Sequence, residues 1–269
     1  MASTIRTTAP KRVPMDAMRK IALAGGLLYL ITYLAIPTLG LYGPVLTDPN
    51  YVVSSGGDTG VLWGAVLELI VAFAIVGTGV VLFPAVKRQH EGVALGFAAA
   101  RIFEAGMIVV GIISLLAVVT LRQEVGAAGG ADVAPLVTTG RALVAIHDWT
   151  FLIGQTLVPG INALLLGSLM YRSALVPRVI PLLGLIGGPL LISSALGQVL
   201  GINEQYSAFS VVAVLPIFVW ELLLGLWMTF KGFNRSAPLM AASAAETGST
   251  DGSAGGIATR PAVSKAGAA

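Results

Sequence analysis

Residues 93–121 read VALGFAAARIFEAGMIVVGIISLLAVVTL, and this stretch decides the fold. It exceeds the ~20 apolar residues that an α-helix needs to cross the hydrocarbon core of a bilayer. Its only charged side chains are Arg101 and Glu104. Unpaired backbone groups are too costly in lipid for any structure other than a helix or a closed barrel, and the stretch lacks the alternation of a barrel strand. It therefore predicts a transmembrane helix.

Five further apolar stretches have the same character. They lie at about 21–41, 61–84, 143–171, 179–200 and 209–230. Of the 269 residues, 56% are hydrophobic and 11% are charged, and the mean hydropathy is +0.87. A soluble domain of this size needs more charge on its surface. We predict an all-α polytopic membrane bundle of six transmembrane helices.

Lysine and arginine gather beside alternate loops, and cytoplasmic loops carry the excess of these residues. The basic residues on the side that we assign to the cytoplasm are Arg6, Lys11, Arg12, Arg19, Lys20, Lys87, Arg88, Arg172, Arg178, Lys231 and Arg235. The opposite loops, at about 42–60 and 122–142, contain Arg122 and Arg141 and are expected to be irregular outer connections. We therefore expect a protein of the plasma or inner membrane with both termini in the cytoplasm.

Three segments follow from this organisation. Residues 1–18 form a cytoplasmic amino-terminal segment, and residues 19–232 form the six-helix membrane domain. Residues 233–269 are rich in Ala, Gly, Ser and Thr and lack the apolar periodicity that builds a core. Such a composition is typical of a disordered tail, here a cytoplasmic one.

Four charged side chains fall deep inside the predicted spans, namely Glu68, Arg101, Glu104 and Glu221. A charge near the bilayer centre costs about 2.5–3.5 kcal/mol on insertion scales, so each is a candidate functional residue. Arg101 and Glu104 are three residues apart and can pair on one helix face, and Glu68 or Glu221 can add a second carboxylate. Because burial disfavours an ionised carboxylate, this buried polar centre can hold a proton. Helix locking, proton or ion handling and ligand binding all remain open.

A second polar set lies in the stretch at 143–171. Asp148, Gln155 and Asn162 recur every seven residues, which keeps them in one stripe of an ideal helix. His147 precedes Asp148 at the expected outer end and is an anchor or a pH-sensitive group there. This outer-face polar stripe either lines a cavity or supplies hydrogen bonds between helices. In the first span, Tyr29 and Tyr33 share one face and either line a cavity or pack between helices, with packing the favoured role.

The residue inventory argues against most catalytic and cofactor classes. The chain has no cysteine and two histidines, too few for a di-haem cytochrome, and it lacks H-E-x-x-H, Walker A and G-x-S-x-G motifs. Its basic residues have no aromatic neighbours of the kind that stack on bases. We expect no catalytic residue, no metal, no cofactor and no nucleic acid. The expected partners are the lipid bilayer and a small-molecule or lipid ligand.

Several motifs together resemble a known family. They are GGLLYLITYLA at 25–35, the R-x-x-E of ARIFEAG at 100–106, the histidine at 147, and GSLMYRSALVPRVIPLLGLIGG at 167–188. Over about residues 17–232 the chain resembles a bacterial membrane family catalogued as domain of unknown function 4386. The resemblance implies that Arg101, Glu104 and His147 are recurrent polar positions of that family, and it implies no activity.

Three functional hypotheses follow. The leading one is a membrane protein that binds or moves a small solute or a proton at the buried polar centre. The second is a non-catalytic accessory or sensory module whose buried charges only fix helix packing. The third is a membrane enzyme acting on a lipid or quinone, with Glu104 or His147 as acid or base. It ranks last because no nucleophile or metal set accompanies these residues, so enzymatic activity is the less favoured expectation.

Overall fold

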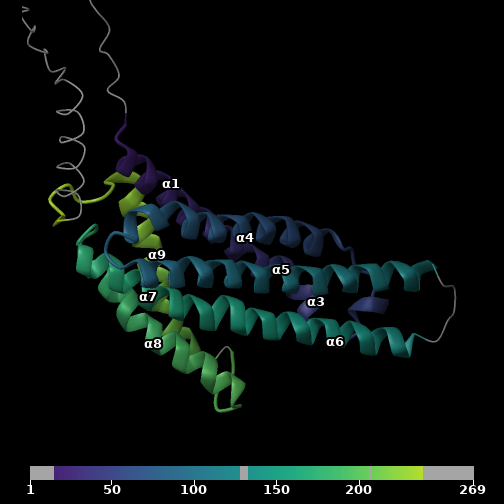
Figure 1. Ribbon diagram of the computed structural model, residues 1–269. Helices are drawn as coiled ribbons and strands as arrows, with labels where there is room; N and C mark the ends of the chain where they lie inside the picture. The colour runs from purple at the N-terminus through teal and green to yellow at the C-terminus, as the bar shows by residue number, and fades with distance from the viewer. Residues whose placement is uncertain (1–14, 128–132, 206, 239–269) are drawn as a thin grey trace, which may run out of the picture.

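The protein is a bundle of six long apolar helices, which confirms the predicted all-α polytopic architecture (Figure 1). The computed structural model describes residues 15–127, 133–205 and 207–238, and no strand occurs within these ranges. The six spans are Ala17–Leu41, Thr59–Val86, Glu91–Val125, Ala134–Ser173, Val179–Val199 and Ala208–Phe230. Each is long and apolar enough to cross a bilayer.

Two of the spans are composite. The elements in chain order are α1 (Ala17–Ile31), η1 (Thr32–Leu34), α2 (Ala35–Leu41), α3 (Gly43–Thr47), η2 (Tyr51–Val53), α4 (Thr59–Val86), α5 (Glu91–Ala127), α6 (Ala134–Phe151), η3 (Leu152–Leu157), α7 (Val158–Ser173), α8 (Val179–Val199) and α9 (Ala208–Phe230). The first span combines α1, η1 and α2, and the fourth combines α6, η3 and α7. Of the joints, η1 is a 3₁₀ turn and η3 is a π-helical turn.

The bundle has two ends that differ in content. At one, which we call the terminal end, the start of α1 meets the end of α9, because the Arg19 guanidinium donates to the carbonyls of Met228 and Thr229 at 2.8 and 2.7 Å. The turns between α4 and α5 and between α7 and α8 lie at the same end (Figure 1). The other three connections form the distal end. The predicted cytoplasmic basic residues that the structure describes therefore lie together, while their side of the membrane stays a prediction.

The first residues of the predicted tail pack on the terminal end. Asn234 donates from its backbone N–H to the carbonyl of Leu175 at 2.8 Å and from its side chain to that of Ala174 at 2.9 Å. Phe233 and Ala237 are buried beside them. This contact fits the left-handed backbone of Ala174 that ends α7. Residues 1–14 and 239–269 lie outside the described ranges.

The helices of the third and fourth spans are much longer than the hydrocarbon core of a bilayer is thick. α5 has 37 residues and the fourth span has 40, so at 1.5 Å per residue they are roughly 55 and 60 Å long, against a hydrocarbon core of about 30 Å. In the connection expected to be irregular at 122–142, residues 122–127 and 134–142 are helical. The helices persist because Leu121, Val125 and Leu136 pack against buried hydrophobic side chains at the distal end, which include Tyr42 and Tyr51.

Close packing between α1 and α9 fixes the centre of the bundle. A Cβ atom on Gly26 would lie only 2.6 Å from the backbone nitrogen of Thr229 and 2.8 Å from the carbonyl oxygen of Gly225. Small residues allow membrane helices to approach this closely. The approach places Tyr29, one turn further along α1, inside the bundle, where it is fully buried.

Candidate functional site

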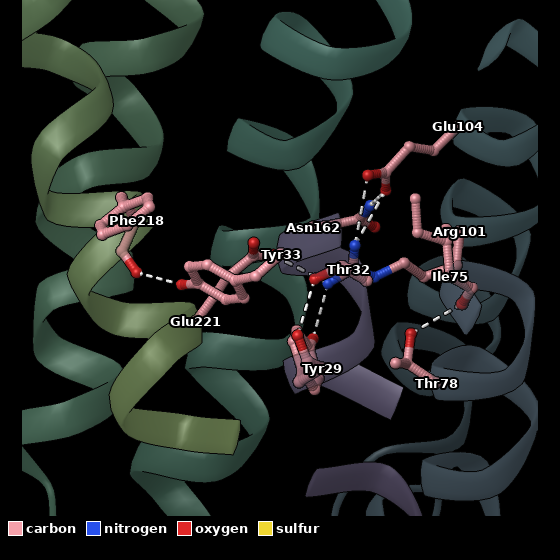
Figure 2. A network of polar contacts seen from close by, with 10 residues as sticks. All are labelled: Tyr29, Thr32, Tyr33, Ile75, Thr78, Arg101, Glu104, Asn162, Phe218 and Glu221. Carbon is pink, nitrogen blue, oxygen red and sulfur yellow. Dashed lines mark hydrogen bonds and ion pairs between the residues drawn. The ribbon is translucent and has the colours of Figure 1, made fainter. Parts of the chain in front are cut away.

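The Arg101 guanidinium on α5 is the hub of a buried polar cluster (Figure 2). Its Nη1 lies 3.1 Å from Oε2 of Glu104, one turn along α5. Its Nη2 donates to Oε1 of Glu221 on α9 at 3.0 Å and to the hydroxyl of Tyr29 on α1 at 2.7 Å. Arg101 is 1% exposed and Glu104 is 4% exposed. The expected pair of Arg101 and Glu104 is present, and Glu221 supplies the second carboxylate.

Aromatic rings and a glycine make room for this cation. The guanidinium lies 4.9 Å from the ring centre of Tyr29 and 5.7 Å from that of Phe97, which precedes it by one turn of α5. Both distances are within the range of a cation–π contact. On the other side, a Cβ atom on Gly79 of α4 would lie 3.2 Å from Cβ of Arg101. The glycine therefore lets α4 pack directly over the base of the arginine side chain.

Asn162 on α7 extends the cluster to a fourth helix. Its side-chain Nδ2 donates to Oε2 of Glu104 at 2.6 Å, and the residue is fully buried. We call Tyr29, Arg101, Glu104, Asn162 and Glu221 the central cluster. It contains one permanent cation and two carboxylates. A net negative charge is expensive inside a membrane, so a proton or another cation bound here would be stabilised.

A cavity of about 210 Å³ adjoins the central cluster. Its polar wall groups are Thr32, Tyr33, Glu104, Gln155 and Glu221, and its other lining residues are aliphatic or aromatic. We call this space the central cavity. Arg101 is not among its lining residues. The cavity therefore meets the two carboxylates of the cluster, with the cation behind them.

The mouth of the central cavity lies between the first span and α9. Three of its lining residues are strongly exposed, namely Ile36 on α2 and Val214 and Phe218 on α9, at 51%, 42% and 41%. They belong to membrane spans, so their exposed surface faces lipid. Just inside, the hydroxyl of Tyr33 donates to the carbonyl of Phe218 at 2.6 Å and the two rings meet edge to face. The cavity therefore opens sideways toward the bilayer.

Glu68 does not join the central cluster. Its carboxylate is 3% exposed, accepts from the Tyr42 hydroxyl at 3.0 Å and lies 3.5 Å from Nε2 of Gln155. His147 contacts the other side of Tyr42, with ring centres 5.7 Å apart, and its Nδ1 lies 3.4 Å from Oδ1 of Asp148. We call Tyr42, Glu68, His147 and Asp148 the distal cluster. The predicted four-residue polar centre is thus divided between two sites.

The structure also divides the predicted outer-face stripe. Asn162 belongs to the central cluster, Gln155 lies between the two clusters, and His147 is buried at 4% exposure. The side chain of Asp148, in contrast, is 56% exposed. The π-helical turn η3 explains the difference, because its wider turn rotates each residue less than an α-helix does. Of the four predicted stripe residues, Asp148 turns outward, while His147 stays buried.

Sequence reasoning missed Tyr42 and gave Tyr29 a packing role. Tyr42 lies at the end of the first span, where a tyrosine is ordinarily an interfacial anchor, yet it is 2% exposed and donates to Glu68. The signal in both cases was a tyrosine on or directly after the first span, in a chain whose other spans carry buried acids and Arg101. Within the described ranges, no three His, Asp or Glu side chains are grouped so as to hold a metal ion.

Comparison with known proteins identifies the family to which the chain belongs. The chain matches no curated protein and no solved structure. The profile of a family described as domain of unknown function (DUF4386) matches residues 23–232, a range that contains all six apolar helices almost completely. Both polar clusters lie inside the matched range. The chain is therefore a multi-pass integral membrane protein that belongs to the DUF4386 family.

Proposed function

We propose that the protein binds a small organic cation with an apolar body in the central cavity, against the carboxylates of Glu104 and Glu221. The observation that carries this proposal is the cavity itself, whose apolar walls end at two carboxylates of one cluster. Its volume of about 210 Å³ is below the roughly 300–1,000 Å³ of pockets for drug-sized ligands. The solute is accordingly small.

The charge of the cavity wall selects the sign of the solute. Arg101 offsets one of the two carboxylates, and the remaining negative charge faces the cavity through Glu104 and Glu221. A positively charged group placed there gains a counter-charge where water does not screen it. The rings of Tyr33 and Phe218 at the mouth add surfaces on which a cation can rest. A neutral or anionic solute gains none of this.

The sideways mouth selects an apolar body. A solute that enters between α2 and α9 passes the exposed side chains of Ile36 and Phe218 and reaches the cavity from lipid. The apolar body of the solute favours partition into lipid. Its charged group remains at the membrane–water interface until it meets the carboxylates. Binding from the membrane, followed by release elsewhere, is the elementary cycle that transport of such a solute requires.

The proposal is tested with a pair of ligands of nearly equal shape, benzyltrimethylammonium and its neutral carbon analogue neopentylbenzene. Radiolabelled benzyltrimethylammonium is bound to the purified full-length protein and displaced by the unlabelled compounds. We expect saturable binding that the cation displaces and the neutral analogue does not. Glu221→Gln should weaken binding at least about tenfold, which corresponds to about 1.4 kcal/mol.

Glu204→Gln is the matched control, because Glu204 is an exposed carboxylate in the turn before α9 and lies outside the cavity lining. It should bind like the unaltered protein. Displacement by neopentylbenzene at equal concentration, or unchanged binding by Glu221→Gln, would overturn the proposal.

One observation favours a second role for the same residues. Arg101 joins α1, α5 and α9 through its three hydrogen-bonded partners, which is what a structural lock in an accessory or sensory module would do. Under that role alone, the protein binds neither benzyltrimethylammonium nor its neutral analogue. The two roles are therefore separable in the same assay.

A further inference from the structure

A second cavity lies at the distal end and is independent of the central one. Its volume is about 260 Å³, and its titratable wall residues are Tyr42, Glu68, His147 and Asp148. It is enclosed by the α2–α3 corner, α4 and α6, and Gln205 closes it from the turn between α8 and α9. We call it the distal cavity. Neither Glu68 nor His147 lines the central cavity.

Its titratable groups lie in order from the surface to the interior and all line the same cavity, although the step from His147 to Tyr42 is a ring contact and not a hydrogen bond. The side chain of Asp148 is 56% exposed, and its Oδ1 lies 3.4 Å from Nδ1 of the buried His147. The edge-to-face contact then leads from His147 to Tyr42, whose hydroxyl donates to Glu68 at 3.0 Å. Asp148 and His147 are consecutive residues of α6, whereas Tyr42 follows α2 and Glu68 lies on α4, so the fold has brought three segments together. Proton relays inside membrane proteins are built from such Asp, Glu and His side chains.

Among the residues that the structure describes, Glu68 also forms no ion pair with a cation. Tyr42 and Gln155 are neutral donors, and Gln205 from the α8–α9 turn is neutral as well. On the adjacent helix α5, Arg101 and Glu104 pair with one another. His147 on α6 is the one group of the distal cluster that can become a cation. A proton bound in the distal cluster would offset the charge of the buried Glu68 carboxylate.

We propose that the distal cavity is a proton-binding site, in which a proton from water at the distal surface reaches Glu68 by way of Asp148 and His147. At each transfer the O–H or N–H bond to the donor breaks as the bond to the acceptor forms, so the net change is one proton taken up from water at the surface and one O–H bond formed on the Glu68 carboxylate. Its site lies next to the central cavity, because Gln155 lines that cavity and touches Glu68. A contact of 3.5 Å is at the limit of a hydrogen bond. The side chain of Gln155 therefore separates the two cavities but is held to Glu68 only weakly.

The π-helical turn η3 positions the side chain of Gln155 between the two cavities. Gln155 lies in the middle of η3, and Pro159 follows shortly after. Proline has no N–H for the carbonyl four residues earlier, which is that of Gln155, and its ring clashes with that carbonyl in a regular helix. The π turn relieves this clash, and such turns are common at functional sites.

The test is infrared difference spectroscopy of the full-length protein in lipid nanodiscs during a titration from alkaline to acid pH. A protonated carboxylic acid has a carbonyl stretch that separates it from carboxylates. We expect a band of this kind that grows as the pH falls and that disappears in Glu68→Gln. His147→Gln should move the midpoint of this band, because it removes the neighbouring titratable group.

His90→Gln is the matched control, since His90 is the other histidine of the chain and lies exposed in the turn between α4 and α5. It should leave the band and its midpoint unchanged. If Glu68→Gln does not fold, Tyr42→Phe retains the carboxyl and removes one hydrogen bond to it, which should shift the frequency of the same band. A titration difference spectrum that neither Glu68→Gln nor Tyr42→Phe alters would overturn the proposal.

Discussion

Replacing Arg101 by methionine tests whether the central cluster is held together by charge. The substitution keeps much of the side-chain volume and removes the cation together with its hydrogen bonds to Glu104, Tyr29 and Glu221. Glu104 suffers most, because its side chain is 5% exposed whereas that of Glu221 is 18% exposed at the cavity wall. Removing one member of a buried ion pair costs about 3–5 kcal/mol. We expect Arg101→Met to lower the free energy of unfolding by this amount.

A double variant isolates the electrostatic part of that cost. Arg101→Met combined with Glu104→Leu removes the stranded buried carboxylate together with its cation. What remains is Glu221 at the cavity wall, the Tyr29 hydroxyl without its arginine donor, and the unpaired Nδ2 of Asn162, an unsatisfied donor that costs about 1–3 kcal/mol. The double variant should therefore be more stable than Arg101→Met alone. If each substitution only removed packing contacts, the two losses would add, and the double variant would be less stable than Arg101→Met.

Equilibrium unfolding in detergent micelles, followed by circular dichroism, measures both effects. Arg141→Met is the control, because Arg141 is an exposed arginine at the distal end, and surface substitutions usually change stability by less than about 0.5 kcal/mol. The reasoning is refuted if Arg101→Met unfolds like Arg141→Met, or if the double variant is less stable than the single one. Either result would mean that the cluster is not a charge-balanced unit.

Two further predictions concern helix packing and the distal end. Gly26→Ala should destabilise the bundle by about 1–3 kcal/mol, because its Cβ atom would lie 2.6 Å from the backbone nitrogen of Thr229. Gly106→Ala is the control and should not destabilise it, because nothing lies within 4 Å of the added Cβ atom. Equal unfolding curves for the two variants would contradict this prediction. Tyr51 lies outside the spans, where burial and the nearby Asp58 raise the pKa of its phenol above the ordinary value of 10.0. Its contribution to stability is fully present below that value and is lost as the pH rises through the raised pKa. Tyr51→Phe should flatten this alkaline loss, and an unchanged pH profile of unfolding would count against the raised pKa.

The sequence was sufficient to predict the six spans because lipid imposes a simple rule. A run of about 20 apolar residues with few charges crosses as a helix whatever its neighbours are, so hydropathy alone places spans such as 179–200 close to α8 at Val179–Val199. The parts outside lipid follow no such rule. Residues 122–127 stay helical because of tertiary contacts such as those of Val125, and these contacts are invisible to a hydropathy profile.

The candidate site divides in the same way between local and tertiary information. The pairing of Arg101 with Glu104 follows from helical spacing, since residues three apart share a face. Which distant carboxylate joins them depends on the relative height and rotation of α4 and α9, which spacing within one helix does not contain. Glu221 lies level with Arg101 and Glu68 does not. The π turn likewise could not be read from the seven-residue repeat that linked Asp148 to Gln155.

A cluster built only to join helices would match each cation with one carboxylate and seal both from any cavity. The central cluster departs from this on two counts, because it has a surplus carboxylate and because Glu104 and Glu221 form part of a cavity wall. The distal cluster repeats the pattern, since Glu68 is buried at a cavity wall beside neutral donors. Surplus buried acid is costly to fold, and two such sites, separated by the side chain of Gln155, are better explained by positive charge that binds at each than by helix packing alone.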